Sequence, residues 1–181
     1  VDVLALQELK LTDDKFPAQA FAEAGYQAQW FGQKTYNGVA LITRSAATGV
    51  VKNIPGFEDE QSRVIAATVD GVRVIGAYFP NGQDPVGLRE TIHCTTEERE
   101  KLQALTALGL TDAVRLFPQP DKNYSWWDYR DLAFRRNRGL RIDHILVSDA
   151  VKARTGACAV DKAPRKNERP SDHAPVVLTL A

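Results

Sequence analysis

The apolar residues of the chain fall mainly into short runs of strand length, several of them with the alternating spacing of a half-buried β-strand. The opening run, Val1–Leu9, is apolar up to its polar end and predicts a buried strand. Arg63–Val69 and Val72–Phe79 flank Asp70-Gly71, and this dipeptide between β-branched runs predicts a tight hairpin. Further strands are expected at Tyr26–Phe31, Gly38–Thr43, Gly49–Asn53, Ser125–Tyr129, Leu140–Val147 and Pro175–Leu180.

Two segments carry helix signals instead. A helix is expected after Asp13 and Asp14, whose carboxylates suit an N-cap, and it should end at Gly25. Thr95 and Glu98 form a capping box, which predicts a second helix with a stripe of leucines. Strands outnumber helices and the hairpin requires antiparallel pairing, so the pattern predicts an α/β or α+β fold with a mixed sheet.

Composition narrows the class of protein. The 181 residues predict one domain and a monomer. Hydrophobic residues make up 44% and charged residues 25%, which excludes a disordered tail, a collagen-like repeat and a disulfide scaffold. Cys94 and Cys158 are far apart and predict two reduced structural thiols in a cytoplasmic protein. No apolar run approaches the roughly 20 residues that span a bilayer, so no membrane partner is expected.

Charge is distributed unevenly along a chain whose net charge is zero. Residues 130–169 contain eleven Lys or Arg and five Asp or Glu, a local balance of +6. Trp126, Trp127 and Tyr129 directly precede this stretch. Basic residues beside aromatic ones suit a phosphate backbone together with a base or sugar surface. The plainer alternative is a solvated loop beside tryptophans that belong to the core.

Three segments could carry chemistry. Glu8 follows the first predicted strand, and a carboxylate at a strand end suits a hard cation such as Mg²⁺. Asp143 lies inside an apolar run and needs a partner, because an unpaired buried charge is costly. Asp172 and His173 lie between prolines, where His173 could bond a phosphate oxygen or move a proton near neutral pH. The plainer alternatives are a surface glutamate, a salt bridge from Asp143 to a nearby arginine, and an incidental Asp-His pair.

Six segments together resemble the exonuclease III-like apurinic/apyrimidinic endonucleases of the endonuclease/exonuclease/phosphatase superfamily. They are Leu6–Lys10, Asn37–Leu41, Tyr78–Gly82, Ser125–Arg130, Asn137–Asp143 and Ser171–Pro175. The Ser-Asp-His motif is shared across the superfamily, whereas Tyr-Phe-Pro-Asn-Gly, Trp-Trp-Asp-Tyr-Arg and Asn-Arg-Gly-Leu-Arg-Ile-Asp resemble the bacterial DNA-repair branch. The resemblance implies an α/β fold, a four-layer αββα sandwich of two mixed β-sheets flanked by helices.

The resemblance also implies a role for each matching residue of the site. Glu8 would be the principal Mg²⁺ ligand, with Mn²⁺ as a substitute, and Asp172 would lie at or near the metal. Tyr78 and His173 would contact the scissile phosphate, and Asp143 would orient His173. Glu8 and His173 would therefore act on the same phosphodiester.

DNA contacts follow from the same resemblance. Asn37 and Asn81 match positions that hold the DNA backbone or the active-site network. Trp126 and Trp127 would wall the pocket for an extrahelical abasic sugar, which is easier to flip than an intact nucleotide. The basic stretch would contribute DNA contacts from Arg130 and Arg138.

The implied function is Mg²⁺-dependent hydrolysis of double-stranded DNA 5′ to abasic sites, with 3′-5′ exonuclease and trimming activity at blocked 3′ ends. The implied location is the cytoplasm, at the nucleoid. Two alternatives remain: a superfamily phosphatase acting on a small phosphoester, and a relative that grips DNA without cutting it. The tryptophan pair and the basic stretch disfavour the phosphatase.

Two elements of the family pattern have no counterpart in the sequence. The family opens with a strand that carries an Asn near the metal, and since the sequence also contains no methionine, we expect residues before Val1. A Gly-Asp-x-Asn segment supplies the expected general base and a transition-state Asn, and it would fall between Gly87 and Leu88. We expect residues to be missing at both points, and a chain truly this short to be unable to hydrolyse DNA.

Overall fold

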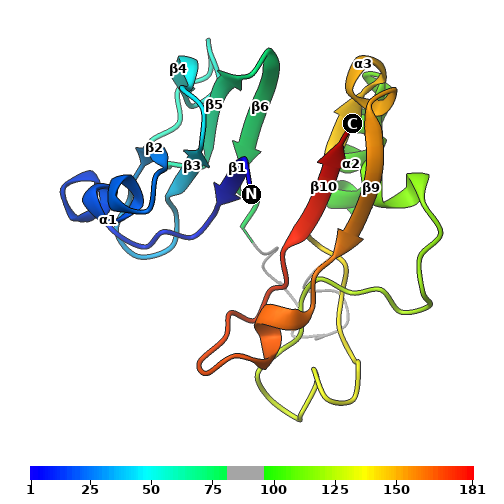
Figure 1. Ribbon diagram of the computed structural model, residues 1–181. Helices are drawn as coiled ribbons and strands as arrows, with labels where there is room; N and C mark the ends of the chain where they lie inside the picture. Colours follow the sequence, from blue (N-terminus) through cyan, green and yellow to red (C-terminus); the bar gives the residue numbers. More distant parts are fainter. Residues whose placement is uncertain (81–95) are drawn as a thin grey trace. The chain divides into compact units, whose positions relative to one another are not determined.

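The computed structural model describes residues 1–80 and 96–181, with only the backbone of Glu98 (Figure 1). The chain divides into two compact units, Val1–Asn81 and Gly82–Ala181. Within the described residues, four small sheets hold three, two, three and two strands, and every pair of strands is antiparallel. Helices accompany these sheets in both units, so the predicted α/β class is confirmed.

The first sheet of unit 1 contains β1 (Val3–Leu6), β3 (Val39–Thr43) and β2 (Gln27–Phe31), in that order. All five residues of β3 are buried because the strand pairs on both edges and packs on both faces. β1 pairs only with β3 among the described strands, and two of its four residues are exposed. The expectation that the opening strand is buried was therefore wrong, because the strand lies at an edge.

The second sheet of unit 1 contains β4 (Thr48–Lys52), β5 (Val64–Val69) and β6 (Val72–Ala77). β5 and β6 form the predicted hairpin, with Val69 opposite Val72. Asp70 and Gly71 have φ angles of 47° and 76°, and two successive positive φ values are the requirement of the tight turn that the dipeptide indicates. The hairpin prediction is confirmed.

The helix expected after Asp13 is interrupted. A 3-10 turn, η1 (Asp13–Lys15), precedes a short helix α1 (Ala18–Glu23). Pro17 lies between them, and the residue before it is extended, as residues before proline usually are. Asp13 caps neither element, because its Oδ1 accepts a hydrogen bond from the Gly32 amide. The capping prediction was therefore wrong.

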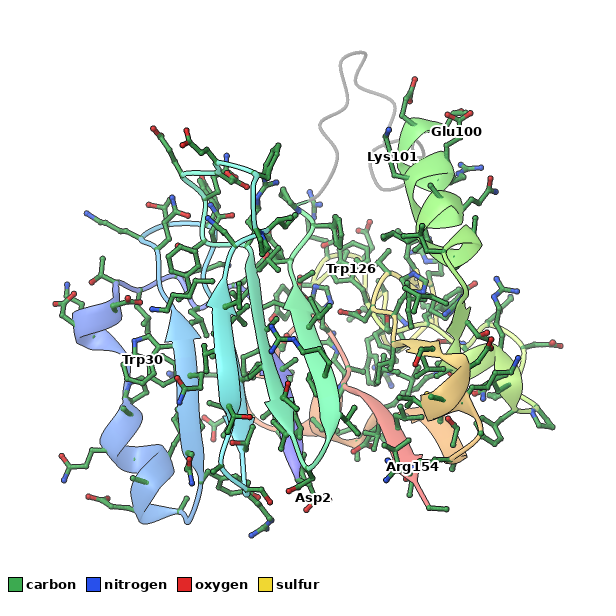
Figure 2. All side chains as sticks on the ribbon, turned by 90° about the horizontal axis from the view of Figure 1, so that it is seen from above. Asp2, Trp30, Glu100, Lys101, Trp126 and Arg154 are labelled. Atoms are coloured by element: carbon green, nitrogen blue, oxygen red, sulfur yellow. The ribbon has the colours of Figure 1, made fainter. Side chains whose placement is uncertain are left out.

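Each face of β3 packs against a different layer of unit 1. Val39 and Leu41 form a buried cluster with Ile65 and Ala67 of β5. On the other face, Ala40 and Ile42 pack beside Phe16 and the α1 segment (Figure 1). Trp30 joins this second cluster: its ring stacks on Phe16 at 4.6 Å, and its Nε1 donates to the Asp13 carbonyl at 3.1 Å (Figure 2).

Unit 2 is built from shorter elements. They are α2 (Thr96–Ala107), β7 (Leu110–Asp112), η2 (Ala113–Leu116), β8 (Leu146–Ser148), α3 (Asp149–Lys152), β9 (Thr155–Val160), η3 (Ala163–Lys166) and β10 (Val176–Leu180). β7 pairs with β8, and β9 pairs with β10. Ala113, Val114, Val147 and Cys158 make the main buried cluster.

The sequence predicted α2 and β10, but it missed β9 and assigned too much strand elsewhere. Ser125–Tyr129 forms no strand, and of Leu140–Val147 only the end belongs to β8. Trp126 instead makes isolated bridges to Leu140 and to His173, so these segments meet at one point without running alongside one another. The expected cap at Thr95 and the second thiol, Cys94, lie outside the described residues.

Within residues 1–80 and 96–181, no helix has the length and apolar character needed to cross a bilayer.

Candidate active site

In unit 1, the segment after β1 carries the Glu8 carboxylate and has an unusual backbone. Glu8 and Lys10 have φ angles of 52° and 55°, in the left-handed region that non-glycine residues rarely adopt. The Leu9 and Lys10 amides donate to the carbonyls of Gly38 and Asn37, at 3.2 and 3.0 Å. Gly38 has a φ of 100°, and a Cβ there would lie 2.8 Å from the Leu9 Cβ. Only glycine fits this close approach, which holds the Glu8 segment in place.

Among the described residues, two side chains bind the Glu8 carboxylate. The Tyr78 hydroxyl donates to Glu8 Oε1 at 2.6 Å, and Lys10 Nζ lies 2.9 Å from Glu8 Oε2. Burial, together with the hydrogen bond and the negative charge of Glu8, raises the pKa of Tyr78 well above its ordinary value. The phenol therefore stays protonated at neutral pH. The residues before Glu8 and Tyr78 are also joined, because Gln7 Nε2 donates to the Ala77 carbonyl at 2.7 Å.

The donor set of unit 1 suits a hard divalent cation held through one protein carboxylate. Glu8 is 38% exposed at its side chain, so a hydrated ion can reach it. Mg²⁺ usually keeps several waters and takes one or two carboxylates plus phosphate oxygens. No group of three or more acidic, histidine or cysteine side chains surrounds a common point in the described parts of the chain. A closed cage built from protein ligands alone is therefore not what these residues form.

Asn37 lies beside this segment and is 8% exposed. Its Nδ2 donates to Gln33 Oε1 at 2.9 Å, and the same oxygen accepts from the Ser62 amide at 2.8 Å. Asn37 therefore belongs to a network behind the Glu8 segment. Asn81, the second predicted asparagine, lies outside the described residues.

In unit 2, Asp143 and His173 form a direct pair. His173 Nδ1 lies 3.0 Å from Asp143 Oδ1 and 2.9 Å from Oδ2. The carboxylate therefore accepts the Nδ1 proton, which fixes the ring and leaves Nε2 as the nitrogen for proton transfer or phosphate binding. His173 is 37% exposed at its side chain and Asp143 is 23% exposed, so the pair is accessible to a substrate.

Ser125 joins the two segments that carry this pair. It is fully buried, and its Oγ accepts from the Ile142 and Asp143 amides at 3.1 and 3.0 Å. Its carbonyl accepts from the Ala174 amide at 2.7 Å. One serine thus bonds to Asp143 itself and to the residue after His173. The sequence did not predict this role, although Ser125 lies in the Ser125–Arg130 segment that carries part of the family resemblance.

The two predicted pocket tryptophans differ. Trp126 is half-buried, and its Nε1 donates to Asp172 Oδ2 at 2.9 Å. Trp127 is fully buried in a cluster with Ala133 and Ala174, and its ring meets Phe134 edge-on at 5.0 Å. A side chain with no exposed surface lines no pocket, so the role predicted for Trp127 was wrong and the core alternative holds for it. One carboxylate oxygen of Asp172 therefore accepts a hydrogen bond from Trp126.

The predicted DNA-binding arginines are both exposed. Arg130 pairs with Asp128, with Nη2 2.5 Å from Oδ2, and is 71% exposed at its side chain. Arg138 donates from Nη2 to the Asp131 carbonyl at 3.3 Å. Neither guanidinium is buried in the protein, so both can meet an anionic partner.

The sequence did not predict a second charged cluster, which contains Asp112, Arg141 and His144. Arg141 Nη1 is 2.7 Å from Asp112 Oδ2, and His144 Nδ1 is 3.7 Å from the same oxygen. Burial opposes ionisation of Asp112, but hydrogen bonds from His144 and Arg141 outweigh it and lower the pKa of the carboxyl to about 2. The residues on either side of the Ile142-Asp143 dipeptide are thereby anchored to β7. A salt bridge to a nearby arginine exists, but it involves Asp112 and not Asp143.

Comparison with known proteins assigns these motifs to a family. The profile of the Endonuclease/Exonuclease/phosphatase family matches residues 1–120 and 94–173. The chain belongs to this family. Exodeoxyribonuclease III of Haemophilus influenzae is 31% identical to it over 235 aligned positions, which cover 97% of this chain and 88% of the relative.

Solved structures agree. A 3′ phosphatase from Neisseria, NExo, solved with a product DNA hairpin, is 40% identical with a TM-score of 0.92, covering 99% of this chain and 89% of that one. An AP endonuclease from Archaeoglobus fulgidus is 26% identical with a TM-score of 0.90, covering 99% and 88%. The chain is therefore an exonuclease III-like hydrolase of the DNA-repair nuclease type, and both the fold class and the predicted resemblance are confirmed.

The alignment with the Haemophilus relative also bears on the absent Gly-Asp-x-Asn segment. Its 235 positions exceed the 181 residues of this chain by 54, so at least 54 aligned positions have no residue here. The alignment therefore contains gaps in this chain. The predicted position of that segment, between Gly87 and Leu88, lies outside the described residues and stays a prediction.

Proposed function

We propose that the protein hydrolyses phosphodiester bonds of double-stranded DNA, 5′ to abasic sites and at blocked 3′ ends. The observation that carries the proposal is the Asp143–His173 pair, in which both carboxylate oxygens lie within 3.0 Å of one imidazole nitrogen. DNA as substrate is supported by the Neisseria relative, which is described as a 3′ phosphatase bound to a product DNA hairpin. The Archaeoglobus relative, described as an AP endonuclease, supports the abasic site.

In this proposal, His173 Nε2 bonds a phosphate oxygen while Asp143 holds the ring and stabilises its charged form. Tyr78 keeps its proton and orients the Glu8 carboxylate, as the hydrogen bond between them supports. Glu8 would hold Mg²⁺, or Mn²⁺ in its place, and the bound ion would neutralise charge on the phosphate. Asp172 would add an oxygen at or near the metal.

Contacts to the rest of the DNA would come from the exposed side chains of unit 2. Arg130 and Arg138 would meet the phosphate backbone, and Trp126 would line the pocket for the extrahelical sugar. The local excess of six positive charges in residues 130–169 supports this, because counterion release from the backbone favours such a stretch.

A second candidate function is DNA binding without cleavage. The observation that favours it is the absence of any Gly-Asp-x-Asn segment from the sequence, which removes the expected general base for the water. Both functions predict salt-dependent DNA binding, and only hydrolysis predicts a metal-dependent product.

The test offers the purified protein three substrates: a duplex with one abasic site, a hairpin with a 3′ phosphate, and a small phosphomonoester. We expect the two DNA substrates to be processed with Mg²⁺, and the reaction to stop when the metal is chelated. Faster turnover of the small ester would contradict the proposal and favour the phosphatase. Tight, salt-sensitive binding with no product at any Mg²⁺ concentration would establish the binding function instead.

Asp143→Asn tests the pair directly. The amide keeps the shape of the side chain but cannot stabilise a charged imidazole, so we expect kcat to fall by about 100-fold or more. Asp149→Asn is the matched control, because Asp149 is an exposed carboxylate at the start of α3 in the same unit. Equal kcat values for the two variants would exclude Asp143 from the mechanism.

A further inference from the structure

Arg165, in η3, is a buried cation that the proposed mechanism does not use. It is 6% exposed. Its guanidinium lies 4.9 Å from the Phe134 ring centroid and 5.5 Å from that of Tyr129. No carboxylate pairs with it among the described residues, and its Nε has no hydrogen-bond partner there. An apolar side chain would fill such a place at lower free energy, because burying a charge without a counter-ion is unfavourable.

The contacts of Arg165 lead to the histidine segment. Its Nη1 donates to the carbonyl of Ser171. The Tyr129 hydroxyl donates to the carbonyl of Pro170 at 2.7 Å. We call Arg165 and Tyr129 the carbonyl clamp, since they grip two successive carbonyls and the guanidinium also lies over the tyrosine ring.

The clamped residues lead directly into His173. The His173 amide donates to Ser171 Oγ at 3.1 Å. Pro170–Ala174 belongs to no helix or strand, so backbone pairing in a sheet does not fix its conformation. Its position instead depends on bonds from side chains and from scattered backbone groups. On the side that precedes the histidine, Asp172 accepts hydrogen bonds from Trp126 Nε1 and from the Trp127 amide. The clamp adds the bonds to the carbonyls of Pro170 and Ser171.

We propose that Arg165 is a positioning residue, which together with Tyr129 fixes the Pro170–Ser171 segment and so sets the orientation of His173 toward Asp143. The expected loss of catalysis rests on the proposed function. The expected change in the orientation of His173 does not depend on it. Arg165 itself is too buried to meet a substrate phosphate, so it acts through the Pro170–Ser171 segment. Its planar guanidinium can stack on two rings while donating to a carbonyl, which a lysine ammonium does less well.

The experiment compares Arg165→Leu, Arg165→Lys and Tyr129→Phe with wild type. Arg44→Leu is the matched control, because Arg44 also lies over a tyrosine ring, at 4.7 Å, but in unit 1 and with a 55% exposed side chain. The first readout is histidine-selective NMR, which resolves three imidazoles in this protein. The second is steady-state cleavage of the abasic duplex and the 3′-phosphate hairpin. Near-ultraviolet circular dichroism establishes that each variant is folded.

We expect the imidazole signal of His173 to shift or broaden in Arg165→Leu. The kcat should fall by about 10–100-fold while KM changes less than about threefold, because a slightly misplaced group lowers the rate of the bound complex. Arg165→Lys should recover part of both losses, and Tyr129→Phe should show a smaller version of them. Arg44→Leu should match wild type.

An unchanged His173 signal in a folded Arg165→Leu protein would overturn the proposal, as would an equal effect from Arg44→Leu. If Arg165→Leu does not fold, Tyr129→Phe decides, since it removes one hydroxyl and keeps the ring: a shifted His173 signal supports the clamp and an unchanged one refutes it. A wild-type protein that cleaves no DNA contradicts the proposed hydrolysis, and the NMR comparison then still decides the positioning role.

Discussion

Removal of the Ser125 hydroxyl tests how the Asp143 segment is held. In Ser125→Ala, the Ile142 and Asp143 amides lose their shared acceptor at a fully buried position. Each buried donor left without a partner costs about 1–3 kcal/mol. Two independent losses would total about 2–6 kcal/mol. Because the two amides share one oxygen and can shift together, we expect the lower part of that range, a loss of roughly 2–4 kcal/mol in the free energy of unfolding.

The assay is equilibrium unfolding in urea followed by tryptophan fluorescence, with hydrogen exchange at the Ile142 and Asp143 amides as a local measure. Ser148→Ala is the control, because Ser148 is exposed and makes no side-chain bond to the helix that it precedes. The control should change stability by less than about 0.5 kcal/mol. If Ser125→Ala loses no more than the control and the two amides exchange as slowly as before, Ser125 does not hold Asp143 in place.

Two further predictions concern stability. Asp112 has a pKa lowered from 3.8 to about 2, so its contribution, roughly 2 kcal/mol, is complete above about pH 4 and is lost as the pH falls through 2. Urea unfolding between pH 6 and pH 2 should show a steeper loss in wild type than in Asp112→Asn, and parallel curves would contradict this. Trp127→Ala should lower the free energy of unfolding by about 3–5 kcal/mol, because the side chain is fully buried. Calorimetry measures this loss, and a near-neutral result would show that Trp127 is not part of the core.

The parts of the fold that the sequence predicted well depend on local signals. The Asp70-Gly71 turn needs only two residues that tolerate positive φ, and its hairpin formed in the predicted place. The first helix was misjudged because Pro17 acted against the capping carboxylates of Asp13 and Asp14. Ser125–Tyr129 has the composition of a strand, but no partner runs alongside it in the described residues, and pairing is a long-range property.

The candidate site shows the same difference between local and long-range signals. Residues whose chemistry is visible in a motif, such as Asp143 and His173, were found, and their pairing could be anticipated because a buried carboxylate needs a partner. Ser125, Arg165 and Asp112 were missed. Each of them acts through groups that are distant in the sequence, and neither composition nor periodicity records which carbonyl or amide a side chain will reach.

The left-handed backbone at Glu8 has a consequence for anyone who alters this protein. A side chain in that conformation costs about 1–2 kcal/mol relative to glycine, and Lys10 repeats the situation two residues later. Libraries screened for heat resistance alone should therefore enrich glycine at both positions. Variants selected in this way would be more stable but would lack the side chains of Glu8 and Lys10. These two codons should therefore be kept constant in such a library.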